Sequence, residues 1–424
     1  MNNRKKYSLL ITSVAALAAS TLVLTIVPAQ ASRNSTLKVG NVLPLTGGLA
    51  GYGVGIDLAA QLGFKDLNAA AKAARIAAKC VWVGTQDDRT SSAGGVEAAT
   101  LLVTSLGAQV ILGGGMNSAT TIAVAKSVTI PKNIPLIAVT SSSPEIATLN
   151  DHDTVFRVYP SDTLQGKALA VAMGKAFGKN AKVSVGFKTD AFGVGLDAVF
   201  EKEWTKAGGT IVNSVGWDPA GTSFTTQAQK LASGSPDGWL IIDNSDTFSK
   251  VVAPLAATGT WKATQTFMTE DFNDASAIAT VEKVVPNALE GVRGTSAAST
   301  GANLAAWKVK FAAANPSDKP TFADSTGYDA AVIACLANIA NTGRHANTYE
   351  KALRAVTDTS APKFTWQNLT GAVKALAGHG HIDFIGPWGE AAFDANGDTG
   401  TGAFNVYKII GGKPVINPAD QLKF

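Results

Sequence analysis

Cysteine and histidine are almost absent from this sequence of 424 residues, which contains two of the first and four of the second. A metal site built from such side chains needs several of them close together, so no metal centre is expected from the cysteines. Cys80 lies in a strand-like run and Cys335 in an apolar helical segment. Two buried free thiols are the first interpretation, and a single disulfide in an oxidising compartment is the alternative.

The motifs of nucleotide binding and of hydrolysis are also missing. The glycines at 113–115 are not followed by the Gly-Lys-Ser/Thr of a phosphate-binding loop. Gly51, Gly53 and Gly55, in an expected loop around Tyr52, do not have the dinucleotide-binding spacing. There is no Gly-x-Ser-x-Gly elbow, and no serine or cysteine has an evident base. We therefore expect no nucleotide cofactor and no catalytic residues.

Two other segments resemble metal sites only in part. Residues 394–398 begin like an EF-hand loop, but Thr399 stands where glycine is needed and Asn405 where glutamate is needed. His379 and His381 have no third ligand at a suitable spacing. A flexible loop is the better interpretation of the histidine pair, and no metal is expected.

Positive and negative charges nearly balance once the N-terminal segment is removed. Residues 1–31 have the pattern of a secretory signal peptide: three basic residues at 4–6, an apolar run at 9–27 and a small-x-small cleavage site at 29–31. An uncleaved membrane anchor is the alternative, because the run is nearly long enough to span a bilayer. Removing three positive charges lowers the formal net charge from +4 to +1, which disfavours a nucleic-acid partner. No cysteine stands at the cleavage point, so we expect a soluble periplasmic or secreted protein without a lipid anchor.

Strand-like and helix-like segments alternate along the rest of the chain. One βα series covers residues 37–158 and a second of similar size covers 162–271. Strict alternation with short connections predicts right-handed βαβ units and parallel sheets, here in two lobes. Beyond residue 292 we expect helices at 305–314, 328–339 and 348–356, and a β-hairpin between 390–393 and 405–410.

Small polar side chains follow two strands of the first series. The strand at 110–112 is followed by three glycines and Asn117-Ser118, and the strand at 136–139 by residues 140–144, Thr-Ser-Ser-Ser-Pro. Ligands of open parallel sheets sit beyond the carboxyl ends of the strands, and glycine lets a ligand approach the backbone. Ordinary loops with helix N-caps are the alternative, but the rest of the chain favours a binding site.

A series of short motifs runs through the whole chain after residue 31. They are residues 38–47 with Tyr52-Gly53, Asp87-Asp88, Asn117-Ser118, residues 140–145, 190–193, 223–225, 267–271, 327–329 and 393–398. In this order and spacing they resemble the type I periplasmic binding proteins, and within them the leucine/isoleucine/valine-binding family of ABC importers. No single motif decides the resemblance; their order along the chain does.

The resemblance implies an α/β fold of two Rossmann-like lobes with parallel sheets, joined by three crossover segments, with the ligand enclosed between the lobes. We place the crossovers near Tyr159, Val292 and Ile385. Lobe 1 would then comprise residues 32–159 and 292–385, and lobe 2 residues 160–291 and 386–424.

The resemblance also implies ligand-binding residues in the first lobe. Asn117 and Ser118 stand where the family binds the ligand carboxylate, although serine is common at the first of these positions. Ser142 stands at the hydroxyl-bearing position, with Ser141 beside it, and Thr140 supplies a carbonyl for an ammonium group. Donors for a carboxylate and acceptors for an ammonium are what a zwitterion removed from water requires.

Four further residues complete the implied shell. Tyr52 and Phe192 match aromatic residues that cover the ligand from the two lobes. Asp271 matches the acid that pairs with the α-ammonium, and a surface-loop acid next to Glu270 is the alternative. Asn244 replaces a common aromatic residue, which puts branched-chain specificity in doubt.

The sequence therefore predicts an extracytoplasmic solute-binding protein of an ABC importer that is not an enzyme. It would capture an amino acid or a similar small amide or carboxylate by closing its lobes, and its partners would be this ligand and the permease transmembrane subunits. We expect a monomer. A ligand sensor for a receptor or kinase and a secreted α/β hydrolase are the alternatives. The ligand itself stays open among branched-chain, polar and aromatic acids, amides and urea-like compounds.

Overall fold

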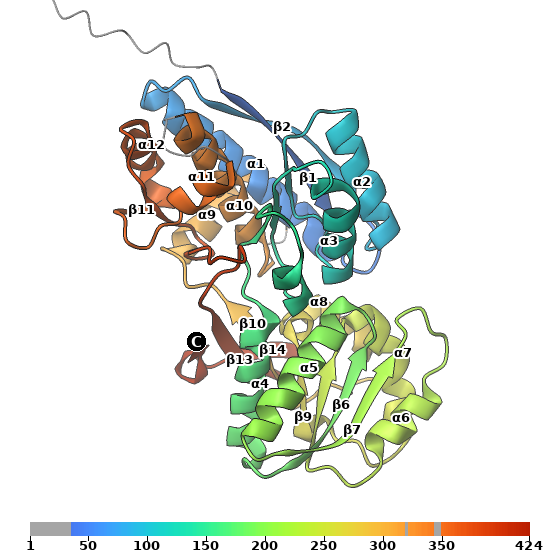
Figure 1. The fold of residues 1–424 in the computed structure, drawn as a ribbon. Coiled ribbons are helices and arrows are strands. Elements are labelled where there is room, and N and C mark those ends of the chain that lie inside the picture. The colour runs from blue at the N-terminus through green and yellow to red at the C-terminus, as the bar shows by residue number, and fades with distance from the viewer. Residues whose placement is uncertain (1–34, 319–320, 343–348) are drawn as a thin grey trace, which may run out of the picture. The chain divides into compact units, whose positions relative to one another are not determined.

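The computed structural model describes residues 35–318, 321–342 and 349–424. The expected signal peptide at residues 1–31 lies outside them. The described chain has an α/β fold with two lobes, each built around its own sheet (Figure 1). Within this part of the chain, no helix is both long enough and apolar enough to pass through a membrane.

The first lobe contains a five-stranded parallel sheet in the order β2-β1-β3-β4-β5. Its strands are β1 (Thr36–Leu43), β2 (Lys79–Asp87), β3 (Val110–Leu112), β4 (Leu136–Ala138) and β5 (Val155–Arg157). Its helices are α1 (Ala50–Ala73), α2 (Ser92–Thr104), α3 (Ser118–Val124), α9 (Leu304–Ala314), α10 (Asp324–Thr342), α11 (Tyr349–Ala355) and α12 (Leu369–Ala377). Helices from both ends of the chain thus share one lobe, and α1 packs against α10.

The second lobe contains an eight-stranded sheet in the order β14-β13-β10-β9-β8-β6-β7, with β15 paired to β13. Its strands are β6 (Lys182–Lys188), β7 (Thr210–Trp217), β8 (Gly238–Ile242), β9 (Thr266–Met268), β10 (Arg293–Ala298), β13 (Ala403–Ile410), β14 (Lys413–Ile416) and β15 (Leu422–Lys423). Its helices are α4 (Asp162–Phe177), α5 (Ala191–Lys206), α6 (Thr225–Ala232), α7 (Ser245–Ala256) and α8 (Ala275–Glu282). Strands β6 to β10 are parallel, and β13 and β14 extend the sheet antiparallel beyond β10.

The expected hairpin between residues 390–393 and 405–410 is wrong. Strand β13 pairs instead with β10 and, across the turn Gly411-Gly412, with β14. Residues 390–393 take part only in isolated bridges. Strand β10 (Arg-Gly-Thr-Ser-Ala-Ala) consists mainly of small residues with weak strand preference. Its sequence therefore did not identify it as a strand, and the pairing of β13 with β10 could not be predicted.

Because β10 belongs to the second sheet, the expected crossover at Val292 comes one strand too early. The three connections run from β5 to α4, from β10 to α9, and from β12 (Asp383–Ile385), which pairs with β11 (Lys363–Thr365), to β13. Two of these connections pack together: the rings of Tyr159 and Trp388 stack with centroids 5.2 Å apart. The stacked rings hold these two connections together between the lobes.

The glycines around Tyr52 lie in helix α1, not in the expected loop. A Cβ on Gly53 would come within 2.0 Å of the Pro44 carbonyl oxygen, and one on Gly55 within 2.4 Å of Asp324 Oδ1. These glycines therefore allow the first turns of α1 to pack closely on the neighbouring backbone and on α10. The close packing fixes the position of Tyr52 in the first turn of the helix.

Cys80 and Cys335 form a disulfide between β2 and α10, with Cα atoms 5.9 Å apart. The first interpretation, two free thiols, is therefore wrong. The two residues are separated by 255 positions in the sequence, so their proximity comes from the packing of the C-terminal helices on the N-terminal sheet. A strand pattern and a helix pattern considered separately do not contain this information.

Replacing both cysteines with alanine is expected to lower the free energy of unfolding by about 2–4 kcal/mol, because the disulfide restricts the unfolded chain across a long loop. Urea unfolding of the wild type, with and without dithiothreitol, and of Cys80→Ala/Cys335→Ala measures the effect. The reduced wild type should match the variant. Equal midpoints for the variant and the oxidised wild type would contradict the expectation.

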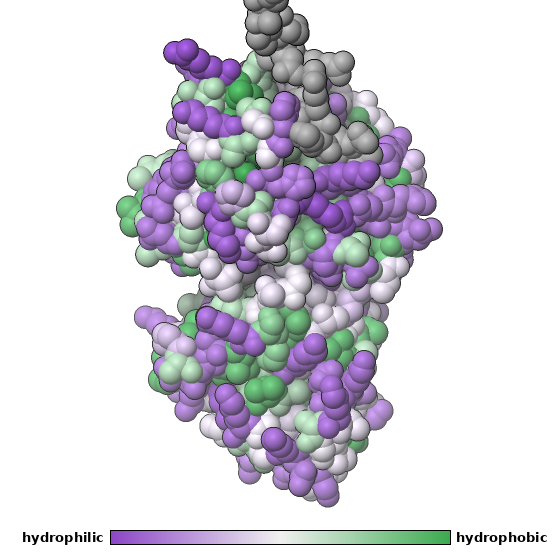
Figure 2. Space-filling view, turned by 60° about the vertical axis from the view of Figure 1, so that its left-hand side comes forward, coloured by the Kyte–Doolittle hydropathy of each residue, from purple (hydrophilic) through white to green (hydrophobic). Residues whose placement is uncertain are grey.

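Exposed large apolar residues are spread over both lobes, for example Val309 on α9 and Val194 on α5. On the face drawn in Figure 2, apolar areas alternate with hydrophilic side chains. Scattered apolar residues are normal on folded surfaces and do not by themselves indicate an interface.

Candidate functional site

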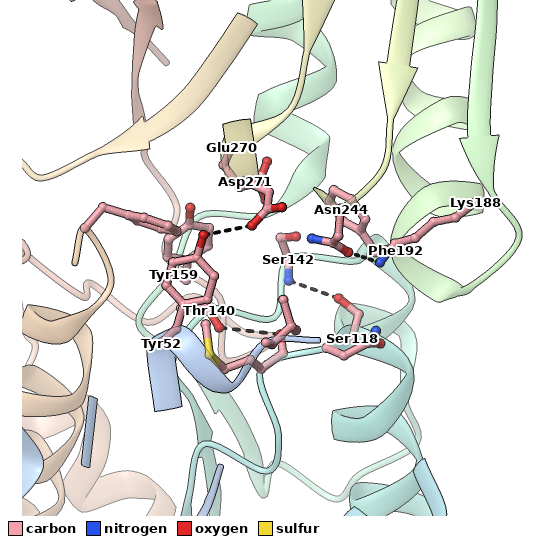
Figure 3. Close-up of a pocket in the computed structure, with 14 residues that line it drawn as sticks. Tyr52, Ser118, Thr140, Ser142, Tyr159, Lys188, Phe192, Asn244, Glu270 and Asp271 are labelled. Carbon is pink, nitrogen blue, oxygen red and sulfur yellow. Dashed lines mark hydrogen bonds between the residues drawn. The ribbon is translucent and has the colours of Figure 1, made fainter. Parts of the chain in front are cut away.

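Strands of both sheets end around one cavity of about 60 Å³ (Figure 3). The first lobe and its connection contribute Leu49, Tyr52, Met116, Asn117, Ser118, Thr140, Ser142, Tyr159 and Phe322, and the second lobe contributes Lys188, Phe192, Asn244, Glu270 and Asp271. The cavity thus lies beyond the carboxyl ends of the strands, where open parallel sheets place their ligands.

Eight of the nine residues predicted at the binding site line this cavity, and Ser141 is the exception. The Ser141 hydroxyl lies 2.6 Å from Thr121 Oγ1 and donates to the Met116 carbonyl at 3.1 Å. Successive side chains of an extended segment point in opposite directions, so Ser141 faces away while Thr140 and Ser142 face the cavity. That the eight residues contact a ligand stays a prediction.

Ser118 ties together the two loops of the first lobe. Its hydroxyl oxygen accepts hydrogen bonds from the backbone N–H groups of Ser142 and Ser143, at 3.2 and 3.1 Å. The Ser142 hydroxyl in turn donates to Asp162 Oδ2 at 3.0 Å. Asn117 is the N-cap of α3 and accepts from the backbone N–H of Ala119 at 2.8 Å. These bonds hold the hydroxyl groups of the site in fixed positions.

Asp271 connects the second lobe with the first. Its Oδ1 accepts a hydrogen bond from the Tyr52 hydroxyl at 2.8 Å, and its Oδ2 accepts from the Ser245 backbone N–H at 2.6 Å. The residue is only 5% exposed, so the interpretation as a surface-loop acid is wrong. Burial raises the pKa of Asp271 above its ordinary value, although both hydrogen bonds act in the opposite direction. A buried acid of this kind gains from a cationic partner.

Glu270 lies next to Asp271 and was not expected at the site. Its Oε2 accepts a hydrogen bond from Gln165 Nε2 at 2.6 Å. Burial raises the pKa of Glu270 as well. Both acids belong to a short 3₁₀ turn, Glu270–Asn273, directly after β9, so the strand end brings two carboxyl groups into the cavity wall.

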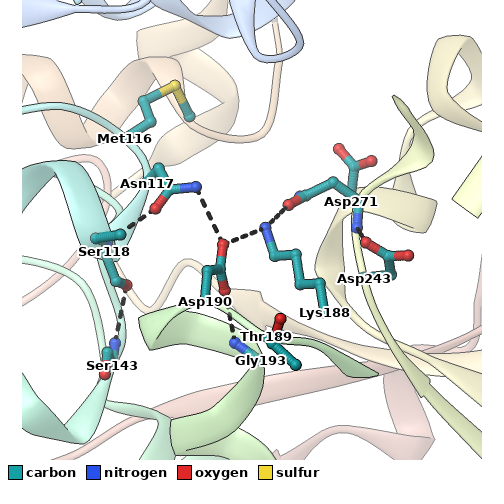
Figure 4. A network of polar contacts seen from close by, with 12 residues as sticks. Met116, Asn117, Ser118, Ser143, Lys188, Thr189, Asp190, Gly193, Asp243 and Asp271 are labelled. Carbon is teal, nitrogen blue, oxygen red and sulfur yellow. Dashed lines mark hydrogen bonds and ion pairs between the residues drawn. The ribbon is translucent and has the colours of Figure 1, made fainter. Parts of the chain in front are cut away.

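Lys188 is the last residue of β6 and contributes a buried cation (Figure 4). Its Nζ lies 3.0 Å from Asp190 Oδ2, donates to Asn244 Oδ1, and lies 5.2 Å from the centre of the Phe192 ring. Burial would lower the pKa of Lys188, but Asp190 and Asp243 raise it above its ordinary value, so the ammonium stays charged. Asn117 Nδ2 donates to Asp190 Oδ2 at 3.3 Å and extends this chain of contacts to the first lobe.

Six lining residues were missed by the sequence reasoning: Leu49, Met116, Tyr159, Lys188, Glu270 and Phe322. Lys188 and Glu270 carried a usable signal, because each lies at the carboxyl end of a strand of the parallel sheet. Phe322 carried none. It precedes α10 and reaches the cavity only because that helix packs on the first lobe.

Residues of the two segments set aside as metal sites make structural contacts. Asp398 pairs with Arg157, and Asp394 Oδ1 accepts backbone N–H bonds from Asn396 and Asp398. His381 Nδ1 lies 2.8 Å from Asp358 Oδ2. Among the residues that the structure describes, no group of three or more histidine, cysteine, aspartate or glutamate side chains is arranged to hold a metal ion.

Residues 36–413 match the model of the family described as periplasmic binding protein. The chain belongs to this family. Its members bind solutes outside the cytoplasm, so the protein is extracytoplasmic and its family is one of binding proteins rather than enzymes. No similarity to a curated protein was found by sequence.

Solved structures of several solute-binding proteins share the fold. A leucine binding protein, LivK, from Thermotoga maritima is 19% identical over 91% of this chain and 99% of its own, with a TM-score of 0.70. LivJ from Streptococcus pneumoniae, in complex with isoleucine, is 19% identical over 92% and 100%, with a TM-score of 0.67. A solute-binding protein from R. palustris, in complex with benzoate, is 21% identical over 90% and 95%, with a TM-score of 0.64. The type I periplasmic binding fold, with its two lobes, is therefore shown.

Proposed function

We propose that this periplasmic binding protein captures an amino acid and delivers it to the permease subunits of an ABC importer. The observation that carries the proposal is the buried carboxyl group of Asp271, held by Tyr52 of the other lobe in the same cavity as the hydroxyl groups of Ser118 and Ser142. A cation-binding group and anion-binding groups thus face one small cavity from two lobes.

This arrangement matches the two ends of a zwitterion. An ammonium removed from water needs a carboxylate, and a carboxylate needs hydroxyl or N–H donors. We propose that Asp271 receives the α-ammonium and that Ser118 and Ser142, with Asn117, receive the α-carboxylate, the Ser142 hydroxyl exchanging its bond to Asp162 for one to the ligand. The isoleucine complex of LivJ and the leucine-binding LivK support an amino acid, whereas the benzoate complex shows that this fold also accepts a ligand without an amine.

Two hydrogen bonds between the lobes support a mechanism in which the lobes close around the ligand. The hydrogen bond from Tyr52 to Asp271 and the one from Asn117 to Asp190 each join the two lobes. A ligand between these pairs adds contacts only when both lobes are engaged, so its binding energy favours the closed arrangement. We propose that the connections after β5, β10 and β12 act as the hinge.

The remaining parts of the proposal concern export and assembly. We propose that residues 1–31 are a cleaved signal peptide, that no lipid anchor is attached, and that the mature protein acts as a monomer without nucleic acid. The permease would recognise the closed form.

A ligand panel tests the proposed function. The twenty standard L-amino acids, urea, acetamide and benzoate are each added to the purified protein, and the melting temperature is measured. At least one L-amino acid is expected to raise it, because a ligand at 100 times its Kd stabilises the folded state by about 2.7 kcal/mol. Titration calorimetry then gives the affinity. A panel in which only urea, acetamide or benzoate binds, or in which nothing binds, would contradict capture of an amino acid.

A further inference from the structure

A second cavity of about 230 Å³ adjoins the first. It is lined by Leu49, Thr90, Ser92, Asn117, Ala119, Thr120, Lys188, Asp190, Pro219, Asn244, Asp246 and Thr247. Leu49, Asn117, Lys188 and Asn244 line both cavities. These four residues therefore stand between the two spaces.

The first cavity alone is too small for an amino acid. One water needs about 10–15 Å³ on this measure of volume, so about 60 Å³ accommodates only a few non-hydrogen atoms. Small-molecule sites usually have about 300–1,000 Å³, which only the two cavities together approach. For an amino acid whose ammonium reaches Asp271, the additional space for the side chain lies on the side of Asn117, Lys188 and Asn244, toward the second cavity.

Three of these four residues, Asn117, Lys188 and Asn244, carry hydrogen-bond donors. Lys188 is 4% exposed and has three N–H bonds, of which Asp190 and Asn244 accept two. The Asn244 oxygen accepts from Lys188, and its Nδ2 points into the first cavity, with no acceptor for it in the described part of the chain (Figure 3). A ligand atom next to both residues meets N–H groups from two directions.

The second cavity continues this polar character. Its walls carry the hydroxyl groups of Thr90, Ser92 and Thr247 and the carboxyl groups of Asp190 and Asp246. An apolar ligand side chain would remove water from the Lys188 ammonium and the Asn244 amide without replacing the lost hydrogen bonds. Leaving buried polar groups unpaired is costly, and sites built around such groups reject ligands that lack the matching atom.

We propose that the ligand is an amino acid whose side chain carries an acceptor oxygen, in a carboxamide or carboxylate group, and that Lys188 and Asn244 bind this oxygen. The inference rests on the proposed function and specifies its ligand. Lys188 and Asn244 then determine specificity, while Asp271 and the first-lobe hydroxyls bind the part common to all amino acids. Branched-chain amino acids are excluded by the same two residues.

Titration calorimetry of the mature wild-type chain tests the inference with L-asparagine, L-glutamine, L-aspartate and L-glutamate against L-leucine, L-isoleucine and L-valine. At least one of the first four is expected to bind about 100-fold more tightly than each of the last three. The amide and acid members of the set distinguish a carboxamide from a carboxylate. Lys188→Met, which keeps the length of the side chain, is expected to weaken binding of the preferred ligand at least tenfold and to leave leucine binding unchanged or stronger.

Two further variants make the outcome decisive. Lys202→Met removes an exposed lysine from α5 and should change neither affinity. Should Lys188→Met fail to fold by circular dichroism, Asn244→Leu replaces it, because the Asn244 side chain makes no capping bond to α7; the same tenfold loss is expected. A branched-chain amino acid that binds at least as tightly, or an unchanged preference in the folded variant, overturns the inference and leaves the proposed function intact. Absence of binding by every amino acid overturns both.

Discussion

Replacing Asp271 with alanine is expected to weaken binding of the amino acid by on the order of 2–5 kcal/mol, because the ligand ammonium would be buried without its partner. The carboxyl group is buried and holds fixed bonds to Tyr52 and Ser245, so it is already oriented before the ligand arrives. Titration calorimetry with the ligand identified by the panel measures the loss.

Two control variants show whether the loss of affinity comes from the missing charge, from the changed shape of the side chain or from general damage to the protein. Asp271→Asn keeps the size of the side chain and should still lose most of the affinity, since only the charge is removed. Asp420→Ala changes an exposed aspartate near the C-terminus and should bind like the wild type. Wild-type affinity in Asp271→Ala would show that the ammonium is bound elsewhere.

The raised pKa of Asp271 makes this binding dependent on pH. Burial raises the pKa of the carboxyl group above that of an ordinary aspartate, so the unliganded protein takes up the proton at a higher pH than free aspartate does. Only the ionised form pairs with an ammonium. Affinity should therefore be full above the raised pKa and decline as the pH falls through it, starting above the ordinary range of an aspartate. In Asp271→Asn this part of the decline should be absent.

Breaking the ion pair between Arg157 and Asp398 is expected to have the largest effect on stability. Arg157 is fully buried, and its Nε and Nη2 donate to the two carboxylate oxygens of Asp398 at 2.5 and 2.6 Å. Its Nη1 donates to the carbonyl of Ser143 at 2.9 Å. The pair thus joins the end of β5, the loop that carries Ser142, and the connection leading to β13.

Asp398→Ala is expected to lower the free energy of unfolding by about 3–5 kcal/mol, because it leaves a buried guanidinium without a counter-charge. Denaturant unfolding measures the change. Asp153→Ala is the matched control: it also removes an aspartate from an arginine, Arg354, but this pair is partly exposed and should be worth about 0–1 kcal/mol. Similar losses in both variants would mean that the burial of Arg157 does not matter.

The local pattern of the sequence was sufficient for most of the fold. Short apolar runs predicted the parallel strands β1 to β9. The segments between them, in which apolar residues recur with the period of a helix, predicted most of the helices. The pattern failed where a strand consists of small residues, as in β10, and where turn signals suggested a local partner, as for β13. Strands β10 and β13 pair with each other although they are far apart in the sequence, and no local preference identifies that pairing.

The site could be predicted to the extent that it follows from strand ends and from the family resemblance. Tyr52, Ser142 and Asp271, which line one cavity, were identified in this way. Lys188 was overlooked because a lysine at the end of a strand ordinarily extends into water. Only the packing of α5, α7 and the first lobe around it turns Lys188 into a buried charge.

The sequence by itself predicted an exported chain and determined two βα series, whose strand ends carry the small polar groups that line the cavity, because these features depend on neighbouring residues. The tertiary structure alone decided that Cys80 meets Cys335, that Arg157 meets Asp398, and that Lys188 stands between two cavities. Each of these three features brings together segments that are distant along the chain. Their energies depend on burial, and burial exists only after the lobes have folded.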